Sequence, residues 1–188
     1  RRFGKSYAAN MLAAYYRKGA SSEEMFSKLD IGKTPDFKRH LNKYDVIHID
    51  IQWFLTNCDD KDKVVGYITK IVLDELKDVY PDILPSEVLS LPDALSRVRN
   101  KTGQKFVIII DEWDVLIRDE AANKKVQDDY IRFLRSMFKG IEPTKYIQLA
   151  YLTGILPIKK ERTQSALNNF REYSMLNAEP LASYIGFT

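Results

Sequence analysis

Cysteine and histidine are scarce in this 188-residue sequence, which contains only Cys58, His40 and His48. A single cysteine excludes a disulfide within the chain, and the three residues together do not make a Cys/His zinc site. Long apolar runs are also missing: none approaches the roughly 20 residues of a membrane span, and the first residues lack a signal-peptide pattern. We therefore expect a soluble protein of a reducing compartment, the cytoplasm, without a membrane partner.

Internal repeats, low-complexity segments and linkers rich in proline, glycine or serine are absent as well. A chain of 188 residues with 45% hydrophobic residues suits one sizeable core, so we expect a single domain over residues 1–188. The formal net charge is only +3, and basic side chains are interleaved with acidic ones. This pattern does not indicate a surface for nucleic acid.

The first residues, RRFGKSYAANMLAAYY, contain Gly4-Lys5-Ser6, which matches the second half of a phosphate-binding loop that runs into a helix. Unpaired N–H groups and the dipole at a helix N-terminus make an anion site. In such a loop Lys5 would reach the β- and γ-phosphates, and the hydroxyl of Ser6 would bind Mg²⁺. The helix is expected over residues 7–18. Its expected apolar side consists of Met11, Leu12, Tyr15 and Tyr16.

A second copy of the tripeptide, Gly32-Lys33-Thr34, serves as an internal control. It lacks a preceding apolar strand, and Pro35 disfavours a helical conformation at Thr34. We expect Gly32 to cap a short helix over residues 22–29. The tripeptide alone is therefore ambiguous, and Gly4-Lys5-Ser6 also fits a plain glycine turn before a helix.

Apolar periodicity predicts alternating strands and helices along the chain. Strands are expected over Asp45–Ile51, over the run that ends at Ile110, in YIQLAYLTGI and in REYSML. Helices are expected over residues 61–80, 93–101 and 123–138. This order predicts an α/β fold with a mostly parallel sheet, in which ligands bind beyond the carboxyl ends of the strands.

Asp111 and Glu112 directly follow the five apolar residues Phe106–Ile110, at the predicted carboxyl end of a buried strand. In a P-loop NTPase the first acidic residue holds Mg²⁺, and the second orients and deprotonates the attacking water. In the alternative interpretation Asp111 caps a helical turn and Glu112 is merely solvated.

The two motifs reinforce each other because one reaction requires both. The additional strand over Asp45–Ile51 indicates the NTPase group whose sheet has the strand order 5-1-4-3-2, here with strand 1 upstream of Arg1. Thr153 would then end the strand beside the acidic one, where its hydroxyl would contact the γ-phosphate or the attacking water. A threonine that simply ends a strand before Gly154 fits equally well.

These residues resemble the AAA-ATPase-like family, which is related to the AAA and signal-transduction ATPases. The segments that carry the resemblance are RRFGKS, VIIIDEWD, LTGILPIKK, SALNNFREYSML and GFT, and they span essentially the whole chain. Trp113 stands where the family usually has tyrosine, and Arg1-Arg2-Phe3 replace small residues. The resemblance implies a three-layer α/β/α domain of bacterial type that binds ATP and Mg²⁺.

The resemblance assigns roles to individual residues. It implies that Lys5, Glu112 and Thr153 are catalytic, and that Ser6 and Asp111 hold the metal. The nucleotide-binding residues that it implies are Gly4, Lys5, Ser6 and Tyr7.

Family members often carry a restriction-endonuclease-like domain downstream, so nucleic acid is an expected partner through that domain. The nuclease motif itself is not found in this chain. The comparison with the family also suggests that the chain is cut at both ends and that it lacks a central strand. A homo-oligomer is a possible assembly, and the sequence does not determine the oligomeric state.

Two rival functions remain at this point: a module that binds nucleotide with little turnover and regulates a partner, and a phosphotransferase. Arg118, Arg162 and Arg171 are candidates for an arginine that stabilises the transition state, and an ordinary surface role fits each of them as well.

Overall fold

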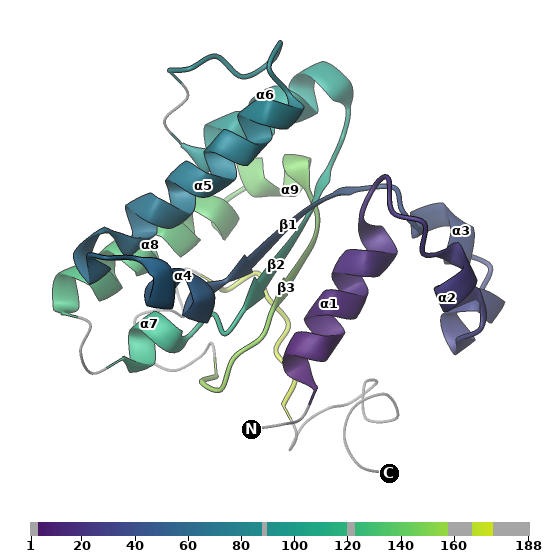
Figure 1. Ribbon diagram of the computed structural model, residues 1–188, viewed down its shortest axis with the longest axis horizontal. Helices are drawn as coiled ribbons and strands as arrows, with labels where there is room; N and C mark the ends of the chain where they lie inside the picture. Colours follow the sequence, from purple (N-terminus) through teal and green to yellow (C-terminus); the bar gives the residue numbers. More distant parts are fainter. Residues whose placement is uncertain (1–3, 88–89, 120–122, 158–166, 175–188) are drawn as a thin grey trace.

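The centre of the molecule is a sheet of three parallel strands (Figure 1). The computed structural model describes residues 4–87, 90–119, 123–157 and 167–174. The strands are β1 (Asp45–Asp50), β2 (Phe106–Asp111) and β3 (Ile147–Leu152), in the order β1-β2-β3. This confirms the predicted α/β fold and parallel sheet, and the order is that expected for strands 2, 3 and 4 of a 5-1-4-3-2 sheet.

Strand β2 is buried along its whole length because helices cover both faces of the sheet. Its side chains alternate between two cores: Ile108 and Ile110 lie in the larger core, and Val107 and Ile109 contact Ala9 in the smaller one. The run of β-branched residues thus forms the central strand between two helical layers.

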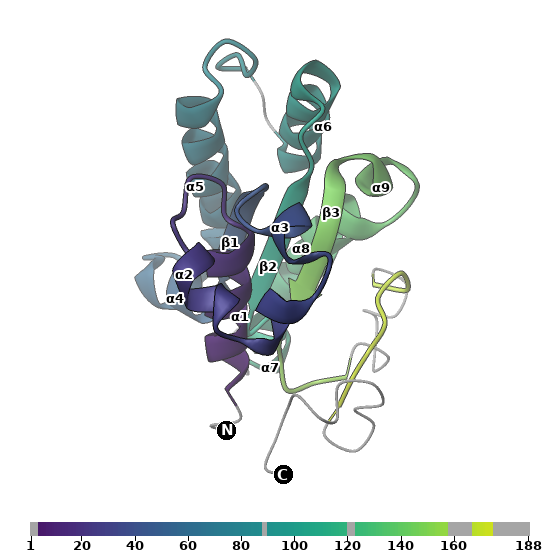
Figure 2. The same cartoon turned by 90° about the vertical axis from the view of Figure 1, so that its right-hand side faces the viewer.

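Helix α1 (Lys5–Tyr16) covers one face of the sheet, and the remaining long helices cover the other (Figures 1 and 2). The long helices of the second layer are α5 (Val64–Val79), α6 (Leu91–Thr102) and α8 (Lys124–Phe138). Shorter helices stand between strands and long helices in the chain: α4 (Ile51–Asn57), α7 (Val115–Arg118) and α9 (Glu142–Tyr146). The 3₁₀-helix η2 (Lys61–Lys63) precedes α5. The three predicted long helices are therefore confirmed, and the layers form an α/β/α arrangement.

Helix α1 buries two sides rather than the single predicted one. Ala9 contacts the sheet, with Leu12 and Tyr16 packed beside it. Tyr15 faces the opposite way, where it packs against Phe26 and Phe37. The single apolar stripe was a wrong expectation because this helix lies between the sheet and a second group of helices.

That second group is an arm built of α2 (Glu23–Ser27), the 3₁₀-helix η1 (Asp30–Lys33) and α3 (Phe37–His40). The expectation that Gly32 caps a helix is wrong: it lies inside η1. A Cβ atom at Gly32 would lie 2.4 Å from the carbonyl oxygen of Ser27, so glycine is needed here for close backbone approach. The second Gly-Lys-Thr tripeptide thus belongs to the arm and does not begin a helix over the sheet.

The predicted last strand is only partly described. Residues 171–173 have no regular structure, Ser174 forms a single bridge, and the rest of REYSML lies outside the described residues. Among the helices that the structure describes, none has the length and apolar character needed to cross a membrane.

Asn42 closes the C-terminal end of α1 and gives the first prediction. It has φ 53°, and its Nδ2 donates to the carbonyl oxygens of Ala14 (3.1 Å), Tyr15 (3.2 Å) and Arg17 (3.1 Å). We expect Asn42→Ala to lower the free energy of unfolding by about 2 kcal/mol, because it removes these bonds and tolerates the left-handed conformation less well. Urea denaturation followed by circular dichroism measures this change.

Asn57→Ala is the matched control. Asn57 is exposed and donates one bond, to the carbonyl oxygen of Trp53 (2.8 Å). Its replacement is expected to change the free energy of unfolding by less than about 0.5 kcal/mol. Equal effects of the two substitutions would contradict the role of Asn42.

Candidate functional site

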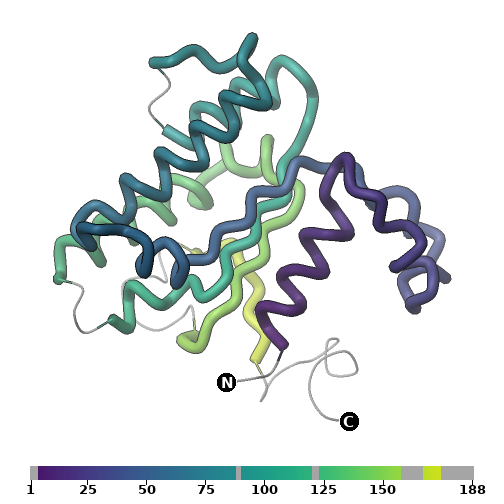
Figure 3. Tube along the Cα trace, viewed as in Figure 1, coloured from purple at the N-terminus to yellow at the C-terminus, as the bar shows by residue number. Residues whose placement is uncertain are grey.

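A cleft of about 540 Å³ lies at the carboxyl ends of the strands. The N-terminal end of α1 lies at the same edge of the sheet (Figure 3). Parallel strands bring their carboxyl ends to one edge of the sheet, and α1 runs back along the sheet toward their amino ends. The cleft is lined by Gly4, Lys5, Ser6, Tyr7, Asp50, Gln52, Asp111, Glu112, Arg118 and Ile155. The cleft therefore brings together the two predicted motifs, which lie far apart in the sequence.

The N-terminal end of α1 is open toward this cleft. Gly4 has φ 75°, a left-handed conformation that suits glycine, and its carbonyl oxygen accepts the first helical hydrogen bond from the N–H of Ala8. No side chain among the described residues caps α1, and the same is true of α5, α7 and α9, whereas Asp50, Ser90 and Asn123 cap α4, α6 and α8. The first N–H groups of α1 are thus left for an anion in the cleft.

The turn after β2 is fixed by hydrogen bonds to the residue that follows β3. Oδ1 of Asp111 accepts a hydrogen bond from the N–H of Glu112 (3.0 Å) and another from the hydroxyl of Thr153. The N–H of Trp113 donates to the carbonyl oxygen of Thr153 (2.9 Å). Asp111 therefore does not cap a helical turn, and its carboxylate is held at the edge of the cleft.

The side chain of Glu112 lies between two cations. Its Oε1 is 3.6 Å from Nζ of Lys5, and its Oε2 accepts a hydrogen bond from Nη2 of Arg118 (3.2 Å). Glu112 is also one of two non-glycine residues with positive φ among those described, at 52°. The ion pairs connect α1, the turn after β2 and α7 across the cleft, so Glu112 is not a merely solvated side chain.

A family model of the AAA-ATPase-like proteins, described as Predicted AAA-ATPase, matches residues 1–163. The chain belongs to this family. Searches of curated proteins and of solved structures gave no significant match. Membership makes the chain a nucleotide-binding domain of the ATPase-like type, in agreement with the resemblance seen in the sequence.

A larger hollow of about 1010 Å³ in this AAA-ATPase-like domain lies over α5, α6 and α8, away from both motifs. Its cations are already paired with aspartates: Lys63 with Asp60 (3.0 Å), Lys70 with Asp74 (2.9 Å) and Arg132 with Asp129 (3.1 Å). The cations of the smaller cleft, Lys5 and Arg118, are paired as well. What distinguishes the smaller cleft is that both predicted motifs line it, so it is the better candidate for an anionic ligand.

Thr153 is close to Asp111 but does not line the cleft. It is 4% exposed, and its hydroxyl donates to Asp111 while accepting from the N–H of Glu112 (3.3 Å). To reach a γ-phosphate the hydroxyl would have to exchange its bond to Asp111. Its predicted contact with the γ-phosphate stays a prediction.

The three candidate arginines lie in different surroundings. Arg118 lines the cleft. Arg171 is exposed, with its guanidinium 5.3 Å from the ring centre of Tyr173, and Arg162 lies outside the described residues. Arg118 is thus the candidate that the fold brings to the predicted catalytic residues.

Asp114 is a site residue that the sequence reasoning missed. It is fully buried and accepts hydrogen bonds from Nε of Arg118 (2.7 Å) and from the N–H groups of Ile155 (3.0 Å) and Leu156 (2.7 Å). Burial and then the charge of Asp114 raise the pKa of the nearby Tyr130, whose hydroxyl donates to the carbonyl oxygen of Trp113. The available signal was the i,i+4 spacing of Asp114 and Arg118.

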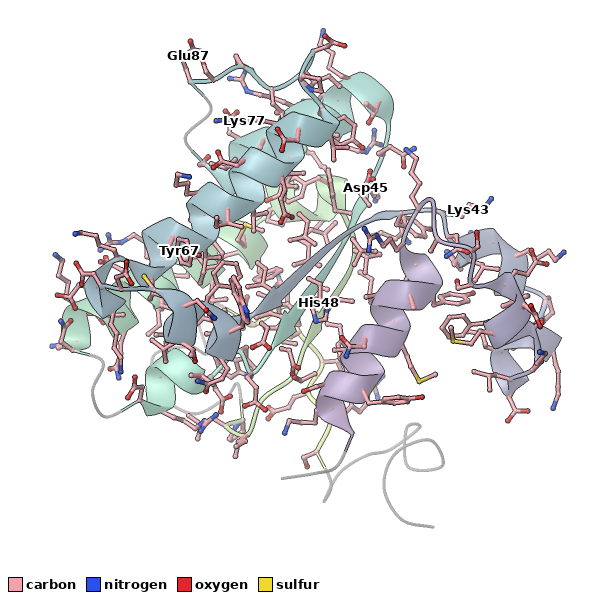
Figure 4. All side chains as sticks on the ribbon, viewed as in Figure 1. Lys43, Asp45, His48, Tyr67, Lys77 and Glu87 are labelled. Carbon is pink, nitrogen blue, oxygen red and sulfur yellow. The ribbon has the colours of Figure 1, made fainter. Side chains whose placement is uncertain are left out.

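Asp50 was also missed, although it is the next-to-last residue of the predicted strand Asp45–Ile51 and the last residue of β1. It lies beside Asp111 in the register of β1 and β2, and its Oδ1 accepts a hydrogen bond from the N–H of Trp53 (3.0 Å), which caps α4. His48, two residues earlier, lies on the side of β1 that faces α1 (Figure 4) and does not line the cleft.

The predicted metal ligands fit magnesium chemistry. Ser6 and Asp111 both line the cleft and offer the hard oxygen donors that Mg²⁺ takes, with water and phosphate completing its coordination. Oδ1 of Asp111 is occupied by two hydrogen bonds, so Oδ2 is the oxygen better placed to take a metal. Across the described part of the chain no three His, Cys, Asp or Glu residues form a cluster that would hold a metal by themselves.

Gly154 gives the prediction for this region. A Cβ atom there would lie 2.5 Å from Nε1 of Trp113 and 2.8 Å from Oδ1 of Asp114. We expect Gly154→Ala to lower the free energy of unfolding by about 1–3 kcal/mol, because the buried indole and the anchored carboxylate have little room to move. Denaturant titration measures the loss.

Gly66→Ala is the matched control, because Gly66 lies at an exposed position within α5, where an added methyl group would have no neighbour within 4 Å. Alanine at this position is expected to raise stability by up to about 1 kcal/mol through its higher helix propensity. A neutral Gly154→Ala would show that the turn after β2 has room for a methyl group.

Proposed function

We propose that this domain binds ATP with Mg²⁺ in the cleft and hydrolyses it. The observation that carries the proposal is the meeting of Lys5, at the open end of α1, with Glu112, which follows the buried acidic strand. Family membership supports nucleotide binding. Turnover and the metal are the parts that this proposal adds.

The residues at the start of α1 would bind the phosphate groups through hydrogen bonds and charge attraction. The N–H groups around Gly4, Lys5, Ser6 and Tyr7 would donate to phosphate oxygens, and Lys5 would reach the β- and γ-phosphates. Ser6 and Asp111 would hold Mg²⁺, which when bound neutralises charge on the phosphate oxygens. Thr153 would sense the γ-phosphate through the hydroxyl that now binds Asp111.

Glu112 would orient a water molecule and accept its proton as the water oxygen attacks the γ-phosphorus. The bond from phosphorus to the β,γ-bridging oxygen breaks in this step, and ADP leaves with that oxygen. The proton then passes from Glu112 to phosphate or solvent. In these reaction steps water is the only group that accepts the γ-phosphoryl group, which favours hydrolysis over phosphotransfer.

We also propose that turnover drives or regulates an appended domain, with nucleic acid as the partner of that domain. The hydrogen bonds from Ile155 and Leu156 to Asp114 support a mechanical link, since they tie the turn beside Glu112 to the segment leaving β3.

The test is Mg²⁺-dependent ATP hydrolysis by the full-length protein, with nucleotide affinity measured on the same samples. We expect Lys5→Ala to weaken ATP binding at least about tenfold, because it removes the cation that faces the phosphates. Glu112→Gln should bind ATP normally and lose at least about a hundredfold in kcat, because its amide cannot accept the proton.

Lys33→Ala is the matched control, because Lys33 occupies the same place in the second Gly-Lys-Thr tripeptide and pairs with Asp30 on the arm (2.7 Å). It should change neither binding nor turnover. A parent protein that binds ATP without hydrolysing it would favour the nucleotide-regulated interaction module, and absence of binding would refute the proposed site.

A further inference from the structure

Arg118 holds two carboxylates at once, one in the cleft and one in the interior. Its Nη2 donates to Oε2 of Glu112 (3.2 Å), and its Nε donates to Oδ2 of Asp114 (2.7 Å). The side chain of Arg118 is 31% exposed, that of Glu112 27%, and that of Asp114 is fully buried. Arg118 therefore connects the proposed catalytic carboxylate to a fixed point inside the protein.

Asp114 is held by partners from two parts of the fold, α7 and the segment after β3. Its Oδ2 also accepts the N–H groups of Ile155 and Leu156, so the carboxylate cannot rotate without losing bonds in a buried place. A guanidinium is planar and donates in a fixed direction, so the bond to Asp114 also sets the direction in which Nη2 points. That direction is toward Glu112.

Lys5 is the weaker of the two partners of Glu112. Its Nζ lies 3.6 Å from Oε1, beyond normal hydrogen-bond length, and a lysine ammonium is a point charge on a flexible stem. In the proposed function Lys5 turns to the phosphates when ATP binds. Arg118, held by Asp114, then remains as the partner of Glu112.

We propose that Arg118 is a positioning residue for the proposed hydrolysis: it fixes the carboxylate of Glu112 where that group orients the attacking water, and Asp114 fixes Arg118. This inference rests on the proposed function and deepens it. The backbone at Glu112 is already set by the turn, with φ 52°, so the remaining freedom lies in its side chain, which is the part that Arg118 restrains. Arg118 acts within its own chain and does not serve a neighbouring subunit.

The experiment compares Arg118→Ala, Arg118→Lys and the parent full-length protein in ATP hydrolysis and ATP affinity. We expect Arg118→Ala to lower kcat at least about tenfold and to leave the Kd for ATP within about twofold, because the group acts on the water-activating residue rather than on the nucleotide. Arg118→Lys should recover part of kcat, since it restores a cation beside Glu112. In a double-mutant cycle Arg118→Ala should cause no further loss in a Glu112→Gln background.

Arg97→Ala is the matched control, because Arg97 forms the same i,i+4 pair with Asp93 (Nε to Oδ2, 2.9 Å) on α6, outside the cleft. It should leave kcat and Kd unchanged. Thermal melting of each variant separates loss of fold from loss of positioning, and Arg118→Lys keeps the test valid if Arg118→Ala does not fold.

Four results would overturn the proposal. Weaker ATP binding with unchanged kcat would make Arg118 a phosphate ligand, and an additive loss in the double mutant would separate it from Glu112. An active parent with an unaffected Arg118→Ala would refute the positioning role alone. A parent that does not hydrolyse ATP would instead refute the proposed function, and this inference with it.

Discussion

The buried carboxylate of Asp114 fixes how the segments around the cleft pack against one another. A charge in the interior is tolerated only when donors surround it, and here the donors come from α7 and from the segment after β3. Both elements must therefore lie against the turn that follows β2. The close approach of Gly154 to Trp113 follows from the same requirement, since the two strands leave the sheet side by side.

The parallel sheet supplies the rest of the arrangement. Because β1, β2 and β3 run in the same direction, Asp50, Asp111 and Thr153 end at one edge, and the return path of α1 brings Lys5 to that edge. The arm plays no part in this geometry. It packs on the outer side of α1 through its own small core. The site thus depends on the strand ends and on one helix end, which are also the parts of the fold that the sequence marks most strongly.

Much of the fold was predictable because local patterns determine it. The β-branched run before Asp111 predicts a strand covered on both faces, and the helical spacing in residues 61–80 and 123–138 predicts helices with one buried side. Apolar periodicity shows which side chains are apolar but not how many other elements pack against the helix. It therefore wrongly predicted a single buried side for α1, which packs against both the sheet and the arm. The rule that glycine caps a helix failed at Gly32, where close approach to the backbone of Ser27 requires glycine.

In the site, the two motifs predicted which residues meet, because each motif is local and the parallel sheet brings both to one edge. The contact between Glu112 and Arg118 was not predictable in the same way. It depends on the left-handed turn at Glu112, which no local pattern predicts.

The charges in the cleft suggest how binding and chemistry are kept apart. A triphosphate brings several negative charges to a cleft that already holds the carboxylates of Asp111 and Glu112, so it must draw on cations that can leave their present partners. Lys5 can do so, because its contact with Glu112 is long and its stem is flexible. Arg118 cannot leave its partners without a large cost in free energy, because the buried Asp114 would then lose its cation. One cation is therefore suited to follow the nucleotide and the other to stay with Glu112, so nucleotide binding need not displace the carboxylate on which the proposed hydrolysis depends.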